Sequence, residues 1–400
     1  MEGAILQEED ITERRFNSLL LFLRIAGTPM HSKRKTIFHG LYNVLAFVSL
    51  HGLFLQFFMG VITKMDIEHV VMATRFFIGG CITVWMQLSL RIQKNAFESL
   101  LLLTESFTWE DQPQTDPDTK SLTMAGVIPR FLKHMRYVLL SVSVYHAVQS
   151  SVRVIIYDDL VFDTWYPFDT SEGLPVLITG IFQVFGTILM LATMSAFSGL
   201  YGIMMCVACS QLEKLRAALL DIKQETSEHE ETFSRMQDQL NACIRHHQEI
   251  KRFMQTLEDV YSPCFCGLFL ISLITFCFFA FSTVLSWGNP GDVIQGLAAY
   301  SLLFACVFIF CRLGTELTAQ AESVGDSAWG CDWVGTPVQF QRCLAFVIAT
   351  AQKEFTLTAG KFVPVSNTTM MNMLNQSVSL FMFLLQMKYR NDGEKEGKLI

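Results

Sequence analysis

The last apolar stretch of the chain reads SNTTMMNMLNQSVSLFMFLLQMK from residue 366 to residue 388. Lys388 is its single charged residue, so the stretch is long enough and apolar enough to cross a bilayer as one helix. It also carries many amide and hydroxyl side chains, which are costly in hydrocarbon. These groups need either partner helices in a bundle or an aqueous path. The sequence therefore predicts a transmembrane helix that is a candidate pore helix, with packing inside a bundle as the alternative.

The composition is that of a membrane protein. Of 400 residues, 51% are hydrophobic and 17% are charged, and the mean hydropathy is +0.35. Soluble proteins carry about 25% charged residues. The net charge is −7 and no basic patch interleaved with aromatic residues occurs, so we expect no nucleic-acid partner. Residues 1–13 are polar and acidic and the next apolar run is broken by Arg24, so the first span is expected to act as the targeting signal.

The cysteines and histidines do not form a metal-binding pattern. Most of the 11 cysteines lie in or beside apolar runs, which indicates small buried residues rather than a disulfide framework. The pairs Cys206/Cys209 and His246/His247 have no second ligand pair at a zinc spacing. We expect no metal site and no cofactor.

Seven apolar runs are long enough to span a membrane, which predicts an all-α membrane protein with seven transmembrane helices. The runs lie at about 36–62, 70–90, 135–157, 175–207, 262–287, 293–312 and 367–388.

The charges in the connections predict the orientation. Residues 209–260 hold seven Lys and Arg residues, whereas residues 158–174 hold five acidic residues and no Lys or Arg. Because Lys and Arg favour the cytoplasmic side, the N-terminus is expected in the cytoplasm and the C-terminus outside. The apolar spacing within 209–260 predicts two amphipathic helices that extend the spans into the cytosol. Residues 338–362 are expected to form one further short helix.

Three local patterns occur in a fixed order along the chain. The loop before the fourth span contains Trp-Tyr-Pro-Phe-Asp at 165–169, and Glu-Ser-Val at 322–324 is followed by Trp329 and Trp333. Ala-Gly-Lys-Phe at 359–362 then precedes the last span. In these patterns, in its length and in its cytoplasmic N-terminus (an inverted topology relative to G-protein-coupled receptors), the chain resembles the insect odorant receptors.

The resemblance implies an odorant-gated, non-selective cation channel in which the last spans of four subunits surround one pore for Na⁺, K⁺ and Ca²⁺. Subunits that tune ligand choice in this family work with a shared co-receptor. Since this chain lacks the co-receptor's longer loop between spans four and five, it resembles a ligand-tuning subunit of a heterotetramer with that co-receptor. The resemblance also implies a multi-pass protein in the lipid of the plasma membrane, in the dendrite of an olfactory neuron.

With these roles the chain divides into seven segments. They are a cytoplasmic N-terminal segment (1–35), a ligand-binding bundle of spans one to four (36–208), cytosolic helical extensions for subunit contact (209–261), spans five and six (262–312), a cytosolic anchor segment (313–365), the pore-lining span (366–388) and an extracellular tail (389–400).

The family's pocket for a small volatile lies in the outer half of the bundle, between spans two, three, four and six. Here it would be lined by Met72, Phe76, Gly79, Tyr145, Val148, Gln149, Phe182, Phe185, Leu189, Ala299, Tyr300 and Leu303. Tyr145, Gln149 and Tyr300 are the preferred polar contacts, because a buried hydroxyl or amide needs a partner. Bundle packing without ligand contact is the alternative for each residue.

The gate is expected on one face of the last span. Phe383, Gln386 and Met387 are spaced by three and four residues, and Ser379 lies one turn earlier. A ring of Phe383 side chains would close the path by dewetting, and Gln386 would offer neutral dipoles to a cation.

Other classes fit less well. The last span carries Ser379-Leu380 where gustatory receptors carry a Thr-Tyr pair, so a gustatory-type channel is the alternative function. A G-protein-coupled receptor is opposed by the inverted topology and by the lack of proline in the last span. An enzyme is opposed by the near absence of charged residues within the spans, where His51 and His146 stand alone, and a transporter by the lack of an internal repeat.

Overall fold

The computed structural model describes residues 12–30, 37–63, 67–115, 120–156, 160–162, 164–168, 173–224, 229–285, 290–353 and 355–396, and within them the chain is mainly helical. Its elements are α2 (Asn17–Ile25), α3 (Ile37–Thr63), α4 (Ile67–Ile92), α5 (Lys94–Leu103), η1 (Thr104–Ser106), α6 (Met124–Ile156), α7 (Leu174–Leu220), α8 (His229–Leu285), α9 (Pro290–Trp329), α10 (Val338–Ala351), β1 (Thr358–Ala359), β2 (Val363–Pro364) and α11 (Asn367–Glu396).

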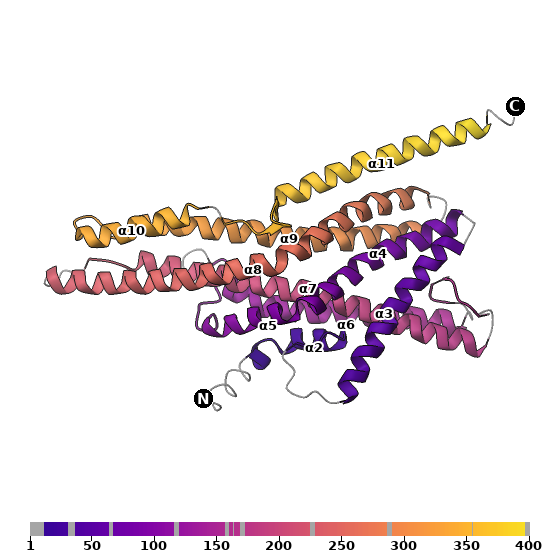
Figure 1. The fold of residues 1–400 in the computed structure, drawn as a ribbon, viewed down its shortest axis with the longest axis horizontal. Coiled ribbons are helices and arrows are strands. Elements are labelled where there is room, and N and C mark those ends of the chain that lie inside the picture. Colours follow the sequence, from indigo (N-terminus) through magenta and orange to yellow (C-terminus); the bar gives the residue numbers. More distant parts are fainter. Residues whose placement is uncertain are drawn as a thin grey trace.

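Seven of the helices in the described residues are 26 residues or longer, and they form one elongated bundle (Figure 1). Five of these seven, α3, α6, α7, α8 and α9, are long and apolar enough to cross a membrane. α4 and α11 have the length as well; α4 contains Arg75, and α11 contains the amides of the predicted pore helix. The predicted all-α fold with seven long helices is confirmed.

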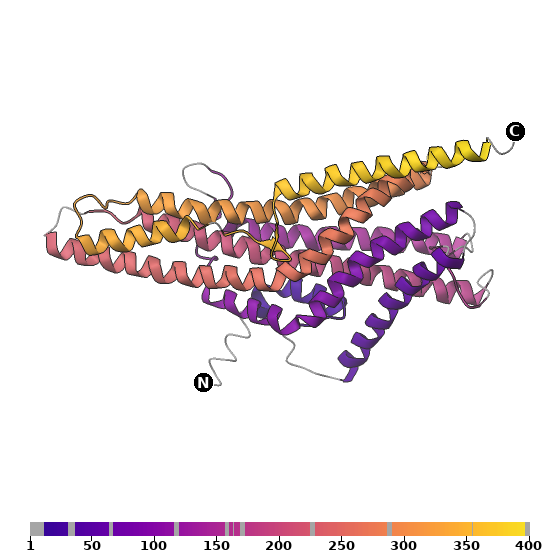
Figure 2. The same cartoon turned by 45° about the horizontal axis from the view of Figure 1, so that its top comes forward.

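The three longest helices extend the bundle at one end. α7, α8 and α9 have 47, 57 and 40 residues, against the roughly 20 that a bilayer requires. Both views show α10 beside the extended parts of α8 and α9 (Figures 1 and 2). Where the three helices meet, Tyr201, Tyr261, Phe265 and Phe310 form a buried aromatic core with ring centroids 5.0–5.8 Å apart. This core fixes the three helices to one another.

Two short helices that the sequence did not predict support the bundle. α2 packs against α7 and α6 and buries Leu19, Leu20 and Leu23. α5 directly follows α4 and packs Phe97 and Leu100 against the main core. The N-terminal segment therefore contributes residues between Phe16 and Met30 to the folded core.

The prediction of one helix over 338–362 was wrong in its second half. α10 ends at Ala351, and the chain then forms an antiparallel hairpin in which Ala359 faces Val363. Gly360 and Lys361 form its turn with φ values of 66° and 67°. Two consecutive left-handed residues are typical of tight hairpin turns and cannot continue a right-handed helix.

α11 follows the hairpin directly. The Ser366 hydroxyl accepts a hydrogen bond from the Thr369 amide at 3.3 Å, which caps the helix, and the Asn367 amide donates to the Thr315 hydroxyl of α9 at 3.0 Å. α11 then runs along the edge of the bundle to the end opposite α10 (Figure 1). It continues past Lys388 to Glu396, so most of the predicted tail is helical.

Candidate functional site

An aromatic cluster lies near the end of the bundle where α3 and α6 finish and α4 begins. Phe57 of α3 and Phe76 of α4 stack with centroids 5.4 Å apart. Phe162, from the loop between α6 and α7, meets Phe76 at 4.7 Å and Phe57 at 5.5 Å, both nearly edge-on. The ring of His146 on α6 lies nearly parallel to Phe162 at 6.2 Å. Three helices and one loop thus meet around four rings.

A buried glutamine holds that loop in place. Gln183 of α7 has no exposed surface. Its Nε2 donates to the Phe162 carbonyl at 2.9 Å, and its Oε1 accepts from the Phe162 amide at 3.1 Å. Both backbone groups of Phe162 are therefore satisfied by one side chain, which fixes the Phe162 ring over the cluster.

The tyrosine of the Trp-Tyr-Pro-Phe-Asp motif strengthens this arrangement. The Tyr166 hydroxyl accepts from Gln183 Nε2 at 3.0 Å and donates to Gln56 Oε1 of α3 at 2.9 Å. Arg153, near the end of α6, donates to the Val161 carbonyl at 3.2 Å. The motif therefore ties the loop to α3 and α7. Asp169, its last residue, lies outside the described residues, as do Asp158 and Asp159.

The same loop borders an apolar groove of about 420 Å³ between α3 and α7. Its walls come from both helices and from the loop residues Trp165 to Phe168. Phe182, a predicted ligand contact, lies in this groove beside Gly52, where an added Cβ would come within 3.2 Å of the Phe182 ring.

The predicted ligand residues take part in several different contacts among the described residues. Phe76 belongs to the aromatic cluster and Phe182 to the groove. Phe185 and Leu189 pack with Leu50 in a separate α3–α7 contact. The remaining members on α4 and α9 have other neighbours. A Cβ on Gly79 would lie 3.8 Å from the Phe279 ring, and the Tyr300 and Phe276 ring centroids are 5.3 Å apart, while Ala299 is half-buried and Leu303 is buried. Their contact with a ligand stays a prediction.

The α6 residues lie on another face of their helix. Tyr145 is 68% exposed and Val148 59% exposed, and Gln149 is also exposed. The assumption that the Tyr145 hydroxyl and the Gln149 amide are buried was therefore wrong for the single chain. The side chain of Met72 lies outside the described residues.

Two polar residues of this region, Gln183 and Arg75, were missed, and His146 was noted only as an isolated residue within a span. Gln183 and His146 stand in apolar runs without a distinguishing motif. Arg75 is 3% exposed within α4, and its Nε donates to the Ser282 hydroxyl of α8 at 3.1 Å. A lone arginine in the run 70–90 is itself a signal, because a charge at membrane depth is rare and costly.

The predicted gate residues lie on the free side of α11. Phe383 is 57% and Met387 45% exposed, and Ser379 and Gln386 are exposed as well. The helix packs its other side against α8 and α9. There, Asn372 and Gln376 line a groove of about 420 Å³ between α8, the hairpin and α11.

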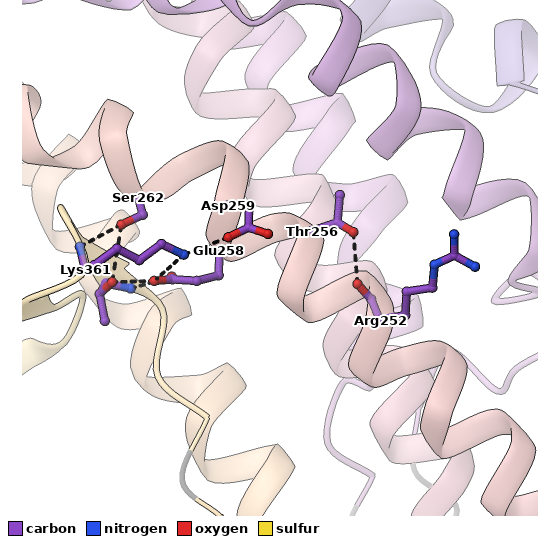
Figure 3. Close-up of polar contacts among 7 residues, drawn as sticks. Arg252, Thr256, Glu258, Asp259, Ser262 and Lys361 are labelled. Carbon is purple, nitrogen blue, oxygen red and sulfur yellow. Dashed lines mark hydrogen bonds and ion pairs between the residues drawn. The ribbon is translucent and has the colours of Figure 1, made fainter.

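The hairpin at the base of α11 is fastened to α8 by a dense set of polar contacts (Figure 3). Ser262 receives both turn amides: its carbonyl accepts from Gly360 at 2.8 Å and its hydroxyl from Lys361 at 2.9 Å. Glu258 accepts from the Thr358 amide at 2.7 Å and from the Thr358 hydroxyl.

An ion pair closes this junction. Lys361 Nζ lies 2.8 Å from Asp259 Oδ1 and 3.5 Å from Glu258 Oε1. The hydrogen bond to Asp259 raises the pKa of Lys361, so the lysine is charged at neutral pH. On the other side, α9 passes so close that a Cβ on Gly314 would come within 2.1 Å of the Val365 carbonyl. The start of α11 is therefore clamped between α8 and α9.

Among the described residues, no group of three or more His, Cys, Asp or Glu side chains is arranged to hold a metal ion.

Sequence comparisons point to one family. A family model described as 7tm Odorant receptor matches residues 66–378. The chain is 24% identical to Odorant receptor 2a of Drosophila melanogaster over 62% of this chain and 65% of that one, and 22% identical to Odorant receptor 67c of the same fly over 96% and 99%. The Odorant receptor coreceptor of Anopheles gambiae is 29% identical over 36% of this chain and 30% of its own. The matches to Odorant receptor 2a and to Odorant receptor 85c, also of Drosophila melanogaster, span 65% and 38% of those two relatives, which is less than two thirds of their length.

Solved structures show the same fold. The insect olfactory receptor OR5 from Machilis hrabei in complex with eugenol superposes with a TM-score of 0.75 at 18% identity, over 95% of this chain and 100% of that one. A second structure of OR5 from Machilis hrabei superposes with a TM-score of 0.69 at the same identity and coverage.

Proposed function

Because the chain belongs to the 7tm Odorant receptor family, we propose that it is a ligand-tuning subunit of an odorant-gated, non-selective cation channel. A small volatile binds in the outer half of the bundle, and α11 lines the pore. The relatives include odorant receptors of a fly and the co-receptors of mosquitoes, which favours an odorant over a gustatory receptor.

The observation that carries the channel proposal is the free side of α11. Phe383 and Met387 lie about one turn apart and both are about half-exposed, and the polar side chains of Ser379 and Gln386 nearby are exposed as well. Lipid alone is a poor partner for such a mixed face, because an amide in hydrocarbon lacks hydrogen bonds. The face instead suits the corresponding faces of other subunits around a narrow water-filled path.

The junction at the base of α11 supports gating by the bundle. α8 contacts α4 and α9 on one side, and through Glu258 and Ser262 it holds the hairpin that begins α11. A change in the packing of α4, α8 and α9 around a ligand therefore reaches the pore helix through direct contacts.

We propose a heterotetramer with the odorant receptor co-receptor in the plasma membrane, permeable to Na⁺, K⁺ and Ca²⁺. The N-terminus and the extended ends of α7 and α8 face the cytosol, in agreement with the Lys and Arg residues between 209 and 260. An epitope tag after Ile400 is expected to be stained on intact cells, and a tag at residue 228 only after permeabilisation. The reverse pattern would contradict this orientation.

The main test is whole-cell current from cells that express the chain, the co-receptor or both, across a broad panel of volatiles. We expect odorant-evoked currents, with little preference between Na⁺ and K⁺, that depend on this chain for ligand choice. Surface-expressed chain together with co-receptor that answers no volatile, or answers as the co-receptor alone does, would overturn the proposal.

A further inference from the structure

His146 carries a buried nitrogen without a hydrogen-bond partner among the described residues. Less than 1 Å² of its Nε2 is accessible. Leaving a buried polar atom unpaired costs about 1–3 kcal/mol, so such atoms usually have a structural or a binding role. His51 on α3 makes a useful contrast, since its Nδ1 contacts the Phe47 carbonyl of its own helix at 2.9 Å.

The surroundings of His146 offer aromatic faces and edges. Its ring is stacked on Phe162, which in turn meets Phe57 and Phe76. The backbone amide and carbonyl of Phe162 are both engaged by Gln183. The cluster therefore combines three benzene rings with one buried nitrogen that lacks a hydrogen-bond partner among the described residues.

Its depth is that of a membrane-embedded site. His146 lies ten residues before the end of α6 at Ile156, and Phe76 nine residues after the start of α4 at Ile67. At about 1.5 Å per residue both lie roughly 14–15 Å below that end of the bundle. This is within the outer half of a hydrocarbon core about 30 Å thick.

We propose that His146 Nε2 is the hydrogen-bond partner of an aromatic odorant with a single hydroxyl or carbonyl group, whose ring packs against Phe76 and Phe162. A neutral imidazole either donates to a carbonyl or accepts from a hydroxyl, so both chemistries fit one atom. The rings favour offset or edge-on aromatic packing. A second polar group on the ligand would find no partner among these rings, so compounds with one oxygen are preferred. This inference rests on the proposed function and adds its ligand class.

The test compares ethylbenzene, acetophenone and 1-phenylethanol, which share a ring and a two-carbon side chain but differ in the oxygen. Dose–response curves are recorded with the co-receptor. For the wild type we expect half-maximal concentrations for the two oxygenated compounds about 5- to 150-fold below that for ethylbenzene, the factor that corresponds to one buried hydrogen bond. An ethylbenzene response too weak to measure agrees with the upper part of this range.

His146→Phe should remove this difference, whereas His146→Gln, which can place an amide near the position of Nε2, should retain most of it. His51→Phe is the matched control and should leave it unchanged. Surface biotinylation identifies variants that fail to fold. If His146→Phe does not reach the surface, the dose–response curves of His146→Gln are used instead to test the inference. A wild type without preference for the oxygenated compounds, or a preference that survives His146→Phe, overturns the inference. Failure of every volatile on the broader panel would instead overturn the proposed function.

Discussion

We expect Glu258, rather than the more exposed Lys361, to be the side chain that holds the base of α11 against α8. Its side chain is 13% exposed and accepts two hydrogen bonds from Thr358 of the hairpin. A hydrogen bond to a charged group contributes about 1.5–3 kcal/mol, and Glu258→Ala would also leave the Thr358 amide without its acceptor. We expect Glu258→Ala to destabilise the junction by about 2–4 kcal/mol.

Lys361→Met is the matched control from the same junction. The Lys361 side chain is 56% exposed, and an exposed ion pair contributes only about 0.2–1 kcal/mol. The hydrogen bond to Asp259 raises the pKa of Lys361 in the folded chain. The ion pair therefore contributes fully to stability at pH values below the ordinary lysine pKa, and this contribution is lost only as the pH rises through the pKa of the folded chain. At neutral pH the pair is intact, and salt should weaken it.

Both variants can be compared by thermal unfolding in detergent and by odorant-evoked current at matched surface expression. We expect Glu258→Ala to lower the unfolding midpoint by several times the shift of Lys361→Met. It should also reduce the maximal odorant current, since α11 is then less tightly held by α8. Equal small shifts in both variants, or a normal current in Glu258→Ala, would refute the reasoning that this carboxylate fixes the hairpin.

Three further predictions concern other parts of the chain. Gln183→Leu removes both hydrogen bonds to the Phe162 backbone and should destabilise the loop by about 2–4 kcal/mol; deuterium uptake over residues 160–168 should rise, and unchanged uptake would contradict the anchoring role. Phe383→Ser should make the closed constriction wettable and raise the current without odorant; an unchanged basal current at equal surface expression would argue against a gate at this residue. Burial and the nearby Lys251 lower the pKa of His247, so the unfolded chain binds the proton more readily and stability falls as the pH drops below the ordinary histidine value of about 6.5. His247→Gln should reduce the loss of thermal stability between about pH 7.5 and 5.5, whereas parallel losses in variant and wild type would exclude this histidine as a cause.

The long helices could be predicted because hydropathy directly reports what a bilayer requires. Arg75 did not prevent the prediction of the second span, because its neighbours in the sequence are apolar enough to accommodate one charged residue. In the structure this arginine donates a hydrogen bond to Ser282. The hairpin was harder, because two residues per strand give no measurable alternation. The sequence signal was Gly360 followed four residues later by Pro364. These two residues indicate that a helix ends here, but they do not show that the chain forms an ordered turn.

The pocket residues show the limit of hydropathy inside a membrane. On α6, Leu139, Ser150 and Val154 are buried while Tyr145 and Val148 are exposed. Because lipid is as apolar as a protein core, the most apolar or aromatic face of a span need not be the packed one. Small residues instead mark close helix contacts: an added Cβ at Gly180 of α7 would come within 2.6 Å of Val154. The residues predicted on α6 from the family resemblance therefore lie on a face that is exposed in the single chain.

α8 contacts α4 and α9 and holds the hairpin at the base of α11, and its sequence indicates where this helix can bend. Pro263 lies in the middle third of α8 and has no amide hydrogen for the carbonyl of Asp259. Both views show α8 changing direction near its middle (Figures 1 and 2), and proline is a common cause of such bends. Asp259 and Ser262, which hold the hairpin, flank this weakened turn. A small change in the bend of α8 would thus occur at the residues to which the base of α11 is attached, so α11 would move with it.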